Sequence, residues 1–309
     1  MNSWMTTLVK TYPAATLRDV ILTGTHDSYS YTADPHKISS DDSNFKACAP
    51  LIGCPGVSCV ATSWTTCTDK TVYDQLCLGV RLISVDVSKY LPEGAYYATH
   101  TMCCVPLQHI LDQIARFLTE TTEVVLLKVT LRANAVASEV NDLLNALKCL
   151  VPPTLDPFTT PLKALTESNA RLFACGDGLP YAAAYIQSNW MNTADPTVAV
   201  QRAEARLGEL ASFKRSAQGL LGFSWVLTPQ TQTVLNGLLC GLYGPVNLEA
   251  RARGFNRRFL SFVSSHQTEV LQNAHFVVFD YVTEELVNAL HAMTLRKLSQ
   301  WFTLKIAMH

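Results

Sequence analysis

The sequence lacks several features that would assign it to a class at once. Its 309 residues carry 24 basic and 25 acidic side chains, so no basic excess predicts nucleic-acid binding. It lacks any run of about 18 uncharged apolar residues, and we therefore expect no transmembrane segment. It also lacks repeats, low-complexity runs and Gly/Ser-rich linkers, so we expect residues 1–309 to form a single domain, and a monomer.

Two further absences concern the cysteines and the N-terminus. Four of the ten cysteines, Cys48, Cys54, Cys59 and Cys67, fall in a predicted loop over about 32–70, but they lack the CxxC pairs of a structural zinc site. The N-terminal segment lacks the apolar core of a signal peptide, which favours a cytoplasmic or peripheral membrane location. Disulfides in the loop would instead favour secretion. Both alternatives stay open.

What the sequence does contain is an alternation of short apolar runs and amphipathic stretches. Eight runs have the length and composition of strands: 19–24, 80–87, 95–100, 123–131, 170–176, 183–187, 219–227 and 275–282. Helical periodicity marks 106–120, 133–150, 196–213 and 283–298. This alternation predicts an α/β fold, a somewhat distorted (β/α)₈ TIM-type barrel, from which the long segment 32–70 departs.

Polar side chains stand where several predicted strands end, which is where barrel enzymes place their chemistry. His26 and Asp27 follow the first strand, His100 ends the third, and Asp280 interrupts the apolar run of the eighth. A carboxylate inside such a run needs a partner, because an unpaired buried charge is costly. In a closed barrel the eighth strand neighbours the first, so His26 is a suitable partner for Asp280.

At this point the sequence resembles the phosphatidylinositol-specific phospholipase C X-domain family, and in particular its compact single-domain members. The resemblance rests on segments that follow the family in order and spacing: TGTHDS at 23–28, TVYDQLCLGVR at 71–81, YYATH at 96–100, EVVLLKV at 123–129, IQSNW at 186–190 and VVFDYV at 277–282.

The resemblance implies a mechanism of general acid–base catalysis. His26 would be the base that takes a proton from the inositol 2-hydroxyl, and His100 the acid that protonates the diacylglycerol oxygen. Asp280 would hold His26 in the correct tautomer, and Asp27 would bind the reacting hydroxyl or support a metal. The products would be diacylglycerol and a cyclic inositol phosphate, and the substrate a phospholipid at a membrane surface.

The sequence departs from the family where the phosphate must be neutralised. Metal-independent members have D-x-R at the positions of Ser84 and Asp86, whereas calcium-dependent members have E-x-D there and a Glu at the position of Thr130. A Ca²⁺ or other divalent cation on Asp27 and Asp86 is one solution, and Lys128 is the alternative without metal. Arg81 alternates away from this face, and we interpret it as part of a structural ion pair.

The resemblance and the positions at the strand ends also predict a set of substrate-binding residues: Lys128, Thr130, Asp177, Ser188, Trp190 and Trp225. Ser188 and Asp177 differ from the residues that grip inositol in bacterial members, so two alternative functions stay open. One is a related barrel phosphodiesterase for another phospholipid, such as a glycerophosphodiesterase or a sphingomyelinase D-like enzyme. The other is a non-catalytic lipid-binding X-domain.

Overall fold

The computed structural model describes residues 3–39, 61–213, 219–230, 233 and 247–307. Its centre is a parallel sheet in the order β7-β6-β3-β1-β10-β9-β8. Within the described ranges β7 and β8 are not paired with each other. The strands are β1 (Leu22–Thr25), β3 (Leu82–Tyr90), β6 (Val125–Leu131), β7 (Leu172–Cys175), β8 (Ile186–Gln187), β9 (Leu220–Trp225) and β10 (Phe276–Phe279).

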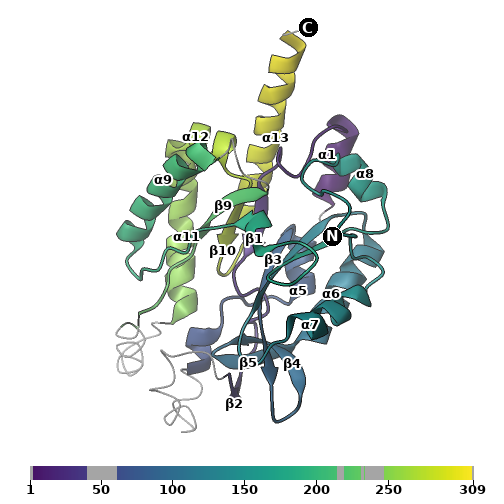
Figure 1. Ribbon diagram of the computed structural model, residues 1–309. Coiled ribbons are helices and arrows are strands. Elements are labelled where there is room, and N and C mark those ends of the chain that lie inside the picture. Colours follow the sequence, from purple (N-terminus) through teal and green to yellow (C-terminus); the bar gives the residue numbers. More distant parts are fainter. Residues whose placement is uncertain (1–2, 40–60, 214–218, 231–232, 234–246, 308–309) are drawn as a thin grey trace.

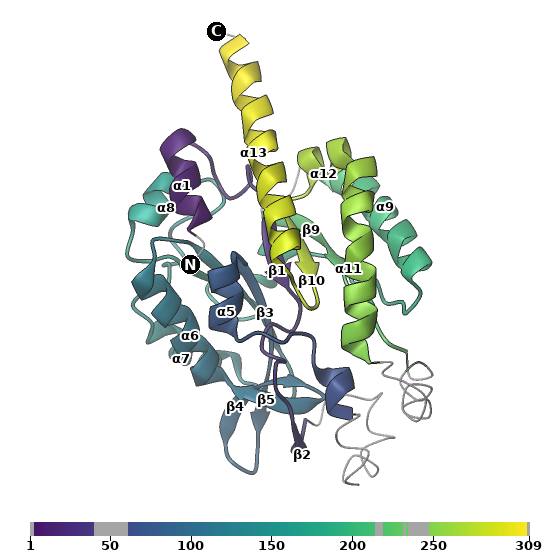
Figure 2. The ribbon, with the colours of Figure 1, turned by 180° about the vertical axis from the view of Figure 1, so that it is seen from behind.

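Helices surround these strands (Figures 1 and 2). They are α1 (Trp4–Thr11), α5 (Val72–Leu78), α6 (Leu107–Glu120), α7 (Ala137–Asn145), α8 (Leu162–Glu167), α9 (Pro196–Phe213), α11 (Leu248–Ser265), α12 (Gln267–Asn273) and α13 (Glu284–Ala307), with a 3₁₀ turn η1 (Ala183–Tyr185). The four predicted helices are confirmed as α6, α7, α9 and α13, and the α/β barrel class is confirmed with them. None of the helices in the described residues is long and apolar enough to cross a membrane.

One predicted barrel strand is wrong. The run 95–100 is β4 (Ala95–His100), which pairs antiparallel with β3 and with β5 (Met102–Pro106), and β2 (Asp34–Ile38) adds to β5. The described residues therefore contain a hairpin extension in place of an eighth parallel strand (Figure 1). This extension carries His100 to the same end of the sheet as the other predicted site residues.

Alternation along each strand divides the core into two clusters, as the pleat of a sheet requires. Leu22, Leu82 and Leu126 pack with α1 in one cluster. Their chain neighbours Ile83 and Leu127 pack in the other cluster, which contains the buried faces of α6, α7, α9 and α11. The first cluster is the barrel interior, and the second lies between the strands and the surrounding helices.

A buried ion pair lies beside α1, and it confirms the interpretation of Arg81. The Arg81 guanidinium donates to Glu123 Oε2 at 2.7 Å, and both side chains are fully buried. Glu123 also accepts the backbone N–H groups of Met5 and Thr6 at 3.2 and 2.8 Å. These amides belong to the first turn of a helix, where a carboxylate is favourable. Arg81 therefore supports the fold, on the opposite side from the residues described next.

Candidate active site

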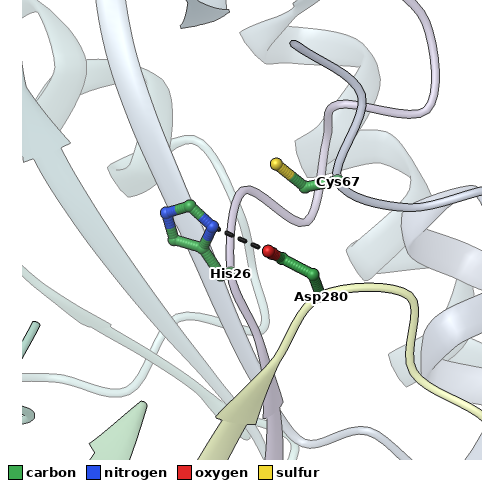
Figure 3. Close-up of side chains that lie close together, drawn as sticks. All are labelled: His26, Cys67 and Asp280. Atoms are coloured by element: carbon green, nitrogen blue, oxygen red, sulfur yellow. Dashed lines mark hydrogen bonds and ion pairs between the residues drawn. The ribbon is translucent and has the colours of Figure 1, made fainter. Parts of the chain in front are cut away.

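His26 and Asp280 form the first element of the site because their strands are neighbours. Thr25 at the end of β1 pairs with Phe279 at the end of β10. The residues that follow them, His26 and Asp280, are therefore neighbours. His26 Nδ1 lies 3.0 Å from Asp280 Oδ1 (Figure 3). Asp280 is 2% exposed, and the predicted partnership of these two residues is confirmed.

Asp27 joins the two histidines. Its Oδ2 lies 3.2 Å from His26 Nε2 and 3.5 Å from His100 Nε2. Its Oδ1 lies 3.0 Å from the Tyr29 hydroxyl. His100 is oriented from its other side, where Nδ1 lies 2.7 Å from the Thr65 carbonyl oxygen. A carbonyl only accepts, so Nδ1 carries a proton, and Nε2 is the nitrogen that faces Asp27.

The electrostatics of this cluster favour the imidazolium form of His26. Burial by itself lowers the pKa of His26, but the carboxylates of Asp27 and Asp280 outweigh it and raise the pKa to about 9. Burial raises the pKa of Asp280, and His26 opposes that shift. Both ring nitrogens of His26 face a carboxylate, which is the arrangement that a cationic imidazole prefers.

The backbone turns sharply after each of three site residues. Asp27, Thr101 and Tyr281, which follow His26, His100 and Asp280, have φ values of 40°, 65° and 46°. Left-handed backbone costs a non-glycine residue roughly 1–2 kcal/mol. It is least expected at a β-branched residue such as Thr101. Strain of this kind concentrates at functional sites, where the surroundings hold it in place.

A pocket of about 340 Å³ opens beside His26 and Asp27, a volume in the range of small-molecule sites. Trp190 forms part of its wall. The ring centroids of Trp190 and His26 are 4.5 Å apart, and Trp190 is 45% exposed. Most of the predicted site residues line this pocket: His26, Asp27, Asp86, Lys128, Thr130, Ser188 and Trp190.

Two predicted substrate residues lie elsewhere. Trp225 is a wrong prediction because its ring is fully buried. It stacks on Phe255 with the ring centroids 4.4 Å apart, and its indole N–H donates to the Phe255 carbonyl. Asp177 is exposed and does not line the pocket.

Arg132 lines the pocket and was not predicted from the sequence. Its guanidinium Nη2 and Nε lie 2.6 and 2.8 Å from Asp86 Oδ2, with about half of the arginine side chain exposed. Burial and the nearby Asp27 raise the pKa of Asp86, and Arg132 opposes the shift. A cationic side chain therefore does line the pocket, and it comes from the residue that follows β6.

This arrangement does not fit the predicted calcium site on Asp27 and Asp86. The carboxylate of Asp86 is paired with Arg132, and both oxygens of Asp27 contact Tyr29 or the histidines. Calcium requires six to eight oxygen ligands. The residue groups with metal-binding geometry in the described part of the chain are of a different kind: His26, Cys67 and Asp280, and Asp27, Cys67 and His100.

Cys67 is the second site residue that the sequence did not reveal. It is a free thiol, 1% exposed, with Sγ 3.7 Å from His100 Nδ1 and 3.9 Å from Asp27 Oδ2. Burial, Asp280 and Asp27 raise the pKa of the thiol well above its usual range. Cys67 forms no disulfide in this structure, and the other three cysteines of the predicted loop, Cys48, Cys54 and Cys59, lie outside the described residues.

The fold and the site define a class: an α/β barrel with two histidines and two aspartates at the carboxyl ends of its strands. Known proteins narrow this class. The phosphatidylinositol-specific phospholipase C of Listeria monocytogenes superposes with a TM-score of 0.60 and 16% identity, over 94% of this chain and 97% of that one. A mutant of the Staphylococcus aureus enzyme gives 0.58 and 12%, over 90% and 91%.

In sequence, a PI-PLC X domain-containing protein of Dictyostelium discoideum is 24% identical over 120 residues, which are 39% of this chain and 20% of that protein. No family model matches the chain. The chain thus has the fold of the phosphatidylinositol-specific phospholipases C, and the predicted resemblance to the X-domain family is confirmed.

Proposed function

We propose that this chain is a phospholipase C-type phosphodiesterase that cleaves the glycerol–phosphate bond of a phosphatidylinositol-like lipid. The observation that carries the proposal is the contact of two histidines with one carboxylate, Asp27, while Asp280 backs His26. Cleavage by an internal hydroxyl needs a base on one side of the phosphorus and an acid on the other. His26 lines the pocket, and the centroid of the His100 ring lies 6.2 Å from that of His26. Two neighbouring imidazoles suit these roles.

In this mechanism His26 Nε2 takes the proton of the inositol 2-hydroxyl, and the hydroxyl oxygen forms a bond to phosphorus. The bond from phosphorus to the glycerol oxygen breaks, and His100 gives that oxygen a proton from Nε2. Diacylglycerol and a cyclic inositol phosphate leave. His26 must lose its own proton first, because its pKa is raised to about 9. The incoming hydroxyl would displace Asp27 from Nε2.

Arg132 takes the role of neutralising the phosphate. It lines the same pocket as His26 and is oriented by Asp86, and a preorganised cation stabilises the charge that develops in the transition state. We assign Lys128, Thr130 and Ser188 to binding the head group, and Trp190 to stacking on its ring. No step is assigned to a divalent cation, because the carboxylate of Asp86 is paired with Arg132.

The test is cleavage of phosphatidylinositol in mixed micelles, followed by phosphorus NMR. We expect cyclic inositol phosphate with and without EDTA, and its loss in His26→Ala and in His100→Ala. His109→Ala, an exposed residue on α6, is the matched control and should retain activity. If either site variant cleaved as fast as the control, the proposal would fall. Release of choline from a panel of phospholipids would favour the alternative of a related barrel phosphodiesterase. Absence of turnover on every lipid would favour a non-catalytic binding role.

A further inference from the structure

The proposed mechanism leaves one buried nucleophilic group of the site unused, the thiol of Cys67. Backbone hydrogen bonds hold this residue on both sides. Its N–H donates to Ser30 Oγ at 2.9 Å, and its carbonyl accepts the N–H of Tyr281 at 2.8 Å. In Figure 3 its sulfur is turned toward His26. The thiol is therefore a fixed part of the cluster.

Cys67 and His100 both lie beside the Asp27 carboxylate, and the sulfur lies 3.7 Å from His100 Nδ1. One ligand atom from each residue lies within 4.8 Å of the other two. Cys67 Sγ lies 3.9 Å and His100 Nε2 lies 3.5 Å from Asp27 Oδ2. Bonds of about 2.0–2.3 Å at tetrahedral angles place ligand atoms roughly 3.3–3.8 Å apart. Rotation of the thiol from Nδ1 toward Nε2 of His100 would bring the three ligand atoms into this range.

The outer contacts of these residues also match those of a metal site. Metal-binding histidines usually donate their second N–H to a carbonyl or carboxylate, which fixes the tautomer. His100 has this arrangement, since Nδ1 lies 2.7 Å from the Thr65 carbonyl oxygen and Nε2 faces Asp27. A thiolate and a carboxylate would neutralise a divalent cation. Sulfur and nitrogen ligands select zinc-like ions over calcium or magnesium.

We propose that Asp27, Cys67 and His100 form a binding site for a thiophilic divalent cation of the zinc type, and that its occupancy inhibits the enzyme reversibly. Binding releases the thiol proton of Cys67 to solvent, and the other two ligands bind through lone pairs, with water in the fourth position. A metal on His100 Nε2 removes the proton donor of the reaction and draws Asp27 away from His26. The inhibition, but not the binding, rests on the proposed function.

The binding is tested with Co²⁺ as a probe on the full chain, since a cobalt–thiolate bond gives a charge-transfer absorption band. We expect this band in the wild type and in Cys175→Ser, which changes another buried free thiol, on β7. Cys67→Ser should lose the band. Zn²⁺ should displace Co²⁺, whereas Ca²⁺ should not, and Cys67→Ser and His100→Gln should each weaken Zn²⁺ binding at least about tenfold.

Several results would overturn the site. They are a wild type without the band, a band that persists in Cys67→Ser, and unchanged zinc affinity in His100→Gln. The last result applies even if the serine variant does not fold. In the activity arm, Zn²⁺ should abolish lipid cleavage, EDTA should restore it, and Cys67→Ser should need at least about ten times more Zn²⁺ for half-inhibition. Equal inhibition of both proteins would refute the inhibitory role. If the metal-free wild type cleaved no lipid, the proposed function would be wrong. The cobalt absorption band would still show whether the metal site exists.

Discussion

The contact between His26 and Asp280 makes Asp280→Asn the sharpest test of the proposed mechanism. The two carboxylates raise the pKa of His26 from 6.5 to about 9 despite its burial. A shift of this size corresponds to ~3 kcal/mol in favour of the imidazolium. Asp280 contributes both its charge and a hydrogen bond of 3.0 Å. We therefore expect its removal to lower the pKa of His26 by about 1 to 2 units.

Two assays measure the effect on the reaction. Because the base must be unprotonated, wild-type kcat/KM should rise with pH toward about 9, and in Asp280→Asn the rise should move to lower pH. The value of kcat/KM at its plateau should fall by roughly 10²–10⁴, because the amide no longer fixes the tautomer. Nitrogen NMR of the imidazole follows the pKa directly. The control is Asp112→Asn, an exposed residue of α6. An unchanged pKa of His26 in the site variant would refute the reasoning.

The same contact makes folding stability depend on pH. The pKa of His26 is higher in the folded than in the unfolded chain, so the folded protein binds more protons between the two values. The contribution of about 3 kcal/mol is fully present below about pH 6.5 and is lost as the pH rises through 9. Urea unfolding at about pH 6 and about pH 9.5 should reveal this loss in the wild type, and a smaller one in Asp280→Asn.

Four further changes test other parts of the structure. Arg132→Met should lower kcat/KM by roughly 10²–10³ with a part regained in Arg132→Lys, and steady-state rates equal to wild type would remove Arg132 from the mechanism. Glu123→Gln should destabilise the fold by about 3–5 kcal/mol in urea, because it leaves Arg81 buried and unpaired; a loss below about 1 kcal/mol would contradict this. Thr101→Gly should stabilise the protein by about 1 kcal/mol, because glycine adopts the left-handed backbone without strain. A lower midpoint of thermal unfolding than that of the wild type would contradict this. Trp190→Ala should raise KM about tenfold with little change in kcat, and the opposite split would argue against stacking.

The predictions that succeeded depended on strand alternation and on barrel closure. Asp280 lies in an apolar run, and its charge required a partner on a neighbouring strand. In a closed barrel the last strand lies beside the first, and the first strand ends at His26, which is the observed partner. Arg81 alternates away from Asp86, and the structure pairs it with Glu123 on the other side of the sheet. In both cases the period of two along a strand was sufficient to assign the side of the sheet.

Strand direction was harder to predict than strand existence. The run 95–100 has the composition of a strand, but composition does not reveal whether its partner is parallel or antiparallel. The signal was in the preceding turn. Gly94 has a φ of 65°, and its N–H donates to the Tyr90 carbonyl at 2.9 Å. A short loop with glycine in the left-handed region, between two strand-like runs, is typical of a hairpin.

Cys67 had no such signal. It lies in the irregular segment before α5, and it reaches Asp27 and His100 because this segment passes beside them. Trp225 failed in the opposite way, since its late position in a strand suggested the rim, whereas its side chain points to the helices and stacks on Phe255. The contacts of an irregular segment are set by tertiary packing. The direction of Trp225, in contrast, follows the period of two, since it shares the helix-facing side with Leu221 and Phe223.

Arg132, the proposed phosphate cation, was not predicted because it follows the strand that is paired with that of Asp86. The pattern of Ser84 and Asp86 on their own strand favoured a metal, because no arginine follows them there. In the structure Asp86 lies opposite Thr130 of the parallel neighbour β6, and Arg132 stands two residues further on the same side, where its guanidinium reaches back to Asp86. A cation on either of two paired strands can therefore occupy the same point of the pocket. Counting one step beyond the predicted end of β6, at the period of two, would have identified Arg132 before the structure did.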